Sequence, residues 1–158
     1  MPRKFYRKSY KSGSGKDKYS VETQVIRVTT SAEGVNGLYQ TAAPVVVPSS
    51  TEGMRKVKHF TCTLAVINQA TPNLIYWALV YVPEGYQANA LRGLGPSFYE
   101  PSQFLIASGI TDPDAGPARI STPLSRNLNS GDAIWLIIGT PSSNITCTGM
   151  VRYAITLQ

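Results

Sequence analysis

The sequence predicts an all-β domain, an antiparallel two-sheet sandwich that follows a short basic arm. Short stretches rich in β-branched and aromatic residues recur along the chain, and glycine- and proline-rich segments separate them. No stretch shows the apolar spacing of an amphipathic helix, and the chain has no internal repeat. A chain of 158 residues is also long enough to bury the core of one domain.

The first expected strand covers residues 21–30, which are rich in β-branched side chains. Its alternation directs the side chain of Arg27 away from the core. Residues 31–55 contain several glycines and prolines and are expected to be irregular, apart from an edge strand at 43–47.

The next pair of strands carries the strongest apolar pattern of the first half. Residues 56–68 alternate, so that one face of the strand holds Phe60, Cys62, Leu64 and Val66. A turn at 69–73 is expected to close a hairpin into residues 74–82. That strand is apolar on both faces, so we expect its outer face to be covered as well.

A long segment, residues 83–103, opens the second half of the chain. It is rich in glycine and proline but also carries apolar side chains, which in a long loop indicate packing against a neighbouring subunit. The apolar residues that we expect at this subunit interface are Leu91, Leu94, Phe98 and Tyr99. Further strands are expected at 104–108, 118–122, 124–128, 133–140 and 145–157. About eight strands in two sheets is the strand count of a jelly roll.

All of the net charge lies in the first eighteen residues. They hold seven of the fifteen Lys and Arg residues and one acid, which gives +6, whereas the remaining 140 residues hold eight basic and eight acidic residues. This segment has few apolar side chains to bury, so we expect it to be disordered without a partner. The chain therefore divides into a basic arm, residues 1–18, and a jelly-roll domain, residues 19–158.

Clustered cations with interleaved aromatic residues suit a polyanion that carries stackable bases, which points to nucleic acid. The alternative is a tail that only improves solubility. The candidate phosphate-binding residues are Arg3, Lys4, Arg7, Lys8, Lys11, Lys16 and Lys18, and the candidate stacking residues are Phe5, Tyr6 and Tyr10. Contacts to the backbone do not distinguish DNA from RNA.

Two further groups of cations lie in the expected strands. Arg27 and Arg152 face outward together if the first and last strands are neighbours, as in a jelly roll, and would then contact nucleic acid or form salt bridges between subunits. Arg55, Lys56 and Lys58 open a strand. They are either solvated residues that protect a sheet edge, a second basic patch facing the nucleic acid, or a site for anionic receptors.

The sequence offers no convincing catalytic, metal or cofactor site, and we expect no enzyme. His59 and Cys62 are three apart on a strand, which places them on opposite faces. Cys62 and Cys147 are expected to be buried free thiols, with a disulfide between the two sheets as the alternative. Two cysteines and one histidine are too few ligands for a convincing metal site.

No apolar run approaches the length of a membrane span, and no signal peptide opens the chain. We therefore expect synthesis in the cytosol without membrane insertion. The basic pairs Arg3-Lys4 and Arg7-Lys8 are compatible with entry into a nucleus.

The order of the segments resembles that of the capsid proteins of small circular single-stranded DNA viruses, the circovirus-like group that encodes a rolling-circle replication protein. After the arm, the matching segments are HFTCTLAV, YWALVYVPEG, SFYEPSQFLIASG, ISTPLSRNLNSGDAIWLIIG and GMVRYAITLQ. The resemblance covers nearly the whole chain. It implies a jelly roll, self-assembly of about 60 copies into a T=1 icosahedral shell, and packaging of single-stranded DNA. It also implies a location in the virion, assembly in the host nucleus and a host-cell receptor.

The arm is short for this family. Its +6 on each of about 60 subunits offsets about 360 charges, against on the order of two thousand phosphates in a genome. Either residues of the body assist, or small cations balance the remainder.

Two other functions fit the same sequence. A carbohydrate- or receptor-binding β-sandwich with a basic tail would favour exposed aromatic residues in loops, such as Tyr39, Tyr86 and Tyr99. A coat protein of a satellite or RNA virus would share the fold and the chemistry of the arm.

Overall fold

The computed structural model describes residues 18–33, 37–50, 52–67, 74–88, 104–112 and 116–156. All of the regular secondary structure in these residues is β-strand. The strands are β1 (Tyr19–Thr30), β2 (Ala32–Glu33), β3 (Tyr39–Val46), β4 (Arg55–Val66), β5 (Ile75–Val82), β6 (Phe104–Thr111), β7 (Ala118–Leu128), β8 (Ala133–Thr140) and β9 (Ile145–Thr156).

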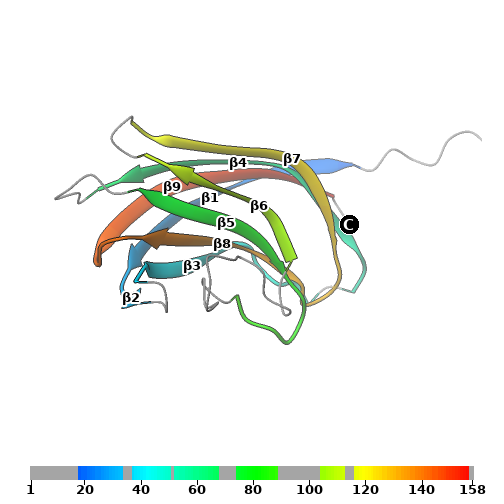
Figure 1. Ribbon diagram of the computed structural model, residues 1–158. Coiled ribbons are helices and arrows are strands. Elements are labelled where there is room, and N and C mark those ends of the chain that lie inside the picture. Colours follow the sequence, from blue (N-terminus) through cyan, green and yellow to red (C-terminus); the bar gives the residue numbers. More distant parts are fainter. Residues whose placement is uncertain are drawn as a thin grey trace, which may run out of the picture.

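The strands form the two antiparallel sheets of a sandwich (Figure 1). The four-stranded sheet has the order β1-β9-β4-β7, and the five-stranded sheet has the order β2-β3-β8-β5-β6, in which β2 is only two residues long. Among the eight longer strands, the chain changes sheet at every connection except that from β5 to β6. This arrangement of four strands against four is a jelly roll, which confirms the fold that the sequence predicts.

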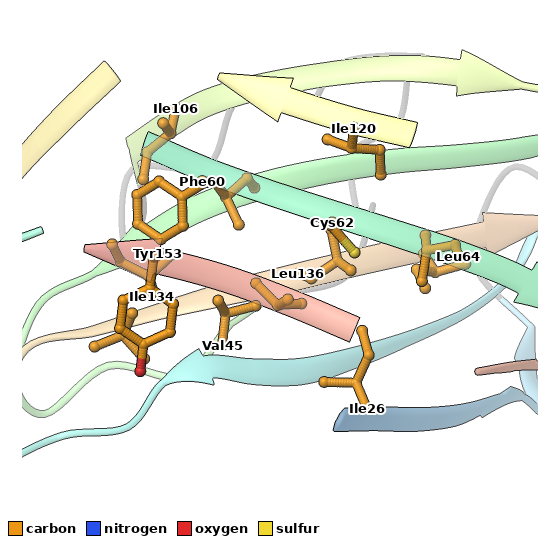
Figure 2. Close-up of a cluster of buried hydrophobic side chains, with 14 of the residues drawn as sticks. Ile26, Val45, Phe60, Cys62, Leu64, Ile106, Ile120, Ile134, Leu136 and Tyr153 are labelled. Atoms are coloured by element: carbon orange, nitrogen blue, oxygen red, sulfur yellow. The ribbon is translucent and has the colours of Figure 1, made fainter. Parts of the chain in front are cut away.

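Apolar side chains from both sheets fill the space between them. Figure 2 shows Ile26, Phe60, Cys62, Leu64, Ile120 and Tyr153 of the four-stranded sheet together with Val45, Ile106, Ile134 and Leu136 of the five-stranded sheet. The rings of Phe60 and Tyr153 pack at a tilt, with centroids 5.8 Å apart. Burial on this scale is the main force that holds the two sheets together.

The outer face of the five-stranded sheet is apolar and buried as well. A second cluster there consists of Ala78, Val80, Val82 and Ile137, each at most 1% exposed. Ala88, which follows β5, packs against this cluster. The expectation that the outer face of the 74–82 strand is covered is therefore confirmed.

The structure corrects the predicted hairpin between the strands at 56–68 and 74–82. β4 pairs with β7 and β9, whereas β5 pairs with β6 and β8 in the other sheet. The connection between them therefore crosses the sandwich. The apolar pattern of the two strands fits either arrangement, because a strand in either sheet turns one apolar face to the core between the sheets.

In three other places the strands differ from the prediction by more than a shift of two residues at an end. The expected edge strand at 43–47 is part of β3, which begins at Tyr39 and whose polar start conceals it in the sequence. The strand expected at 104–108 extends to Thr111. The two short strands expected at 118–122 and 124–128 form the single strand β7, which tolerates Pro123 because it lies at an edge of its sheet.

One buried carboxylate connects two turns at an end of the five-stranded sheet. Asp132 is 3% exposed and accepts hydrogen bonds from Tyr81 Oη at 2.7 Å, from the backbone N–H of Asn129 at 2.7 Å and from that of Glu84 at 3.1 Å. Burial and then the hydrogen bond to Asp132 raise the pKa of Tyr81 to about 12. The turn also contains Gly131, whose φ of 81° suits glycine.

Both cysteines are free and buried, as predicted. In the pairing of β4 with β9, Cys62 lies opposite Val151 and Cys147 lies opposite Val66. The two cysteines therefore share one sheet, with Cα atoms roughly 14 Å apart, which is twice the reach of a disulfide of about 7 Å. A disulfide linking the sheets is excluded. Burial raises the pKa of Cys62 to about 12 and that of Cys147 to about 11.

Candidate nucleic-acid interface

The outer face of the four-stranded sheet gathers cations from all four strands. Its inner face is fixed by core residues on each strand, namely Ile26, Cys62, Ile120 and Val151. Side chains that alternate with these point outward. The outward cations are Arg27 on β1, Arg152 on β9, Lys56 and Lys58 on β4, and Arg119 on β7.

No carboxylate among the described side chains lies on this outer face. Glu22 is on β1, but it alternates with the outward residues. The other acids whose side chains are described lie outside the four strands of this sheet; they are Glu52, Glu84, Asp112 and Asp132. The body is neutral in sequence, but the described side chains of this face include five cations and no acid, so we expect its potential to be positive.

The register of the sheet distributes the five cations evenly along the strands. Residues that face each other across neighbouring strands form rows, and successive outward rows are about 7 Å apart. Each of five successive rows contains one cation, in the order Arg27, Arg119, Arg152, Lys58 and Lys56. Like charges are thereby spread over the face instead of being placed directly opposite each other.

Arg27 and Arg152 lie on the same outer face, as the sequence predicts. Arg27 lies opposite Thr148, and Thr23 lies opposite Arg152, because β1 and β9 are neighbours. Both arginines are exposed. Their Cα atoms are separated by roughly 14 Å, so each can contact a different group of an extended ligand.

The predicted patch of Arg55, Lys56 and Lys58 is divided by the structure. Lys56 and Lys58 lie on the outer face, and Lys58 Nζ is 3.6 Å from the centroid of the Tyr19 ring, a cation–π contact. Arg55 alternates with them and donates to the Val47 carbonyl at 3.4 Å instead. β4 lies between β9 and β7, so protection of a sheet edge is not the role of these residues.

Sequence reasoning missed Arg119. It alternates with Ala118 and Ile120, both buried, so the strand pattern alone assigns it an outward direction. That pattern does not say which sheet the strand joins. Only the pairing of β7 with β4, in which Arg119 lies opposite Thr63, places it on the cationic face.

Most of the predicted arm and loop residues lie outside the described part of the chain. They are Arg3, Lys4, Phe5, Tyr6, Arg7, Lys8, Tyr10, Lys11, Lys16, Leu91, Leu94, Phe98 and Tyr99. Lys18 is described and exposed. It precedes the start of β1, at the end of the sheet where β9 ends and β4 begins (Figure 1). The arm therefore joins the domain beside Lys56 and Lys58.

Among the described residues, no group of three or more His, Cys, Asp or Glu side chains is placed to hold a metal ion. His59 is exposed at a β-bulge with φ of 57°, whereas Cys62 is buried, so the two do not form a reactive pair. No helix that is long and apolar enough to cross a membrane occurs in the described residues.

No protein-family model and no curated protein matches the sequence. The chain shows weak similarity to a number of solved structures, among them the following three. A protein of Bacillus endospore appendages, a family of disulfide-linked pili, has a TM-score of 0.41 and 13% identity, covering 92% of this chain and 95% of that one. Latent PorU of Porphyromonas gingivalis matches with a TM-score of 0.30 and 10% identity, covering 93% of this chain and 14% of that one. A chain in the structure of infectious bursal disease virus, Gx strain, matches with a TM-score of 0.28 and 9% identity, covering 87% of this chain and 32% of that one. Similarities at this level carry no argument about function.

Proposed function

We propose that the protein is a viral capsid protein, similar to those of small circular single-stranded DNA viruses. It assembles into a small icosahedral shell and packages the genome through its basic arm. The observation that carries the proposal is the junction of arm and domain: an arm of charge +6 meets the jelly roll at Lys18, at the end of a face that has five cations and no acid among its described side chains. Both elements recognise a polyanion, and their continuity makes them one site.

The jelly roll supports this function as a scaffold. Viral shell subunits use this topology, although lectins and cupins use it too, so the fold alone does not decide. The difference between the outer faces of the two sheets favours a shell subunit over the other functions of this fold. One sheet exposes cations, and the outer face of the other is apolar and covered. A shell subunit needs this difference because one surface faces the genome.

Exposed apolar residues on two edge strands favour assembly with further copies. They are Leu105 and Ile110 on β6 and Leu124 on β7, between 42% and 61% exposed. A neighbouring subunit would cover them. By contrast, of the tyrosines that a carbohydrate-binding function would use, Tyr86 is exposed and Tyr39 is half-buried at the start of β3. These two do not lie side by side in a loop.

Purification followed by negative-stain microscopy and nuclease typing tests the proposal. We expect uniform particles that contain nucleic acid sensitive to DNase and resistant to RNase. Particles sensitive to RNase would support the satellite or RNA-virus alternative. A protein that stays monomeric at every salt concentration and pH contradicts assembly as its function.

A further inference from the structure

Four of the outward cations lie along a diagonal of the four-stranded sheet. From Arg27 on β1 the diagonal passes to Arg152 on β9 and then to Lys58 and Lys56 on β4. The Cα separations along it are about 14 Å, 8 Å and 7 Å. It ends beside Tyr19, where the basic arm joins the domain. The four cations therefore mark a path from Arg27 to the point where Lys18 joins the arm to the domain.

The longest gap in this path is filled by apolar side chains. Val25 and Met150 lie opposite each other in the row between Arg27 and Arg152. They are 69% and 52% exposed, although their neighbours along the diagonal are charged. Exposed apolar residues set between cations match a ligand whose charged groups alternate with flat apolar ones.

A single-stranded nucleic acid has this composition. Its phosphates suit the arginines and lysines, and its unpaired bases have apolar faces that can rest on Val25 and Met150. A sulfated polysaccharide offers only the C–H faces of sugar rings that are crowded with hydroxyl and sulfate groups, so it gains less from the apolar pair. In a duplex, the faces of the bases are already stacked on one another and cannot reach Val25 and Met150.

We propose that this diagonal, Arg27–Arg152–Lys58–Lys56 with Val25 and Met150, binds a segment of single-stranded nucleic acid as a continuation of the arm. The inference rests on the proposed function and specifies its ligand and its path. It also addresses the shortage of charge on the arm. Four more cations on each of about 60 subunits add about 240 charges to the roughly 360 of the arms.

The experiment measures how the affinity of the full-length protein for a fluorescent oligodeoxythymidylate depends on salt. The test variant is Arg27→Gln with Arg152→Gln. The matched control is Arg55→Gln with Arg126→Gln, which removes two arginines of the same sheet that alternate with the outward residues. We expect the log–log salt slope to become shallower by about 1.4 in the test variant, at about 0.7 for each lost contact. The control should keep the slope of the unchanged protein.

A second variant, Val25→Thr with Met150→Thr, tests the contact with bases at constant charge. It should bind the oligonucleotide several-fold more weakly with an unchanged salt slope, and it should bind heparin as the unchanged protein does. Equal losses for heparin and oligonucleotide, or no loss for either, overturn the contact with bases. If heparin binding alone depends on Arg27 and Arg152, the face is a glycan site and the proposal is wrong.

Microscopy of the same preparations separates this proposal from the proposed function. If the protein forms shells that contain DNA but the test variant keeps the salt slope of the unchanged protein, binding along the diagonal is wrong and the capsid function stands. If the unchanged protein forms no shells, the capsid function fails, whatever the slope. Thermal unfolding of each variant excludes loss of fold as the cause of weaker binding.

Discussion

At the residue scale, one buried side chain, Asp132, holds two turns together. One carboxylate accepts a side-chain hydroxyl and two backbone N–H groups, and so connects the turns that follow β5 and β7. A buried acid is stable only when its oxygens are satisfied in this way. The sequence indicates the turn at Asn129–Asp132, but the partners Tyr81 and Glu84 are distant in the chain and only the fold brings them together.

We predict that Asp132→Ala lowers the free energy of unfolding by about 3 kcal/mol, because three donors lose their acceptor at a cost of about 1–3 kcal/mol for each one that stays buried and unpaired. Urea denaturation measures the loss. Tyr81→Phe is the matched control, since it removes one donor and leaves the carboxylate with two, and it should cost about 1 kcal/mol. Equal losses for the two variants would show that the backbone contacts contribute nothing.

Tyr81 also makes stability depend on pH in the alkaline range. Its pKa is raised to about 12 in the folded protein, from an ordinary value of 10.0, by burial and by the bond to Asp132. Below pH 10 the phenol is protonated in both states and its contribution is complete. Above pH 10 the unfolded state ionises first, so stability falls until the folded phenol also ionises near pH 12. We predict that urea midpoints fall less for Tyr81→Phe than for the unchanged protein between pH 9 and pH 11.

At the element scale, strands with a strong alternation were predictable and sheet membership was not. The prediction for residues 133–140 is confirmed at both ends, and those for the first and last strands differ from β1 and β9 by two residues or fewer at each end. The hairpin at 69–73 is wrong because a local turn signal does not reveal whether the next strand stays in the sheet. For the same reason Arg119 was missed.

Gly149 shows how tightly the central strands of the four-stranded sheet are packed. A Cβ at this position would lie 2.5 Å from the Thr63 carbonyl oxygen and 2.7 Å from Leu64 Cδ2. The carbonyl belongs to the backbone of β4 and cannot move without disturbing the sheet. We predict that Gly149→Ala costs about 1–3 kcal/mol in urea denaturation. Met150→Ala, at the adjacent exposed position, should change stability by less than about 0.5 kcal/mol, and a larger loss there would contradict the assignment of faces.

At the scale of the whole molecule, the distribution of charge relates the fold to the proposed function. The sequence indicates a charged arm and a neutral body. The fold shows that the neutrality of the body is an average, because its strands place five cations on one face without a described acid among them. Composition could not reveal this, since it depends on alternation and register together. The arm and this face are the two parts of one proposed site for nucleic acid.

The salt dependence of single-stranded DNA binding by the intact protein tests this account most directly. Seven cations in the arm predict a log–log slope near −5, and the four cations of the diagonal extend it to about −8, at about −0.7 for each contact. A slope near −8 supports a continuous site on arm and sheet. A slope near zero contradicts nucleic-acid binding by either part, and with it the proposed packaging function.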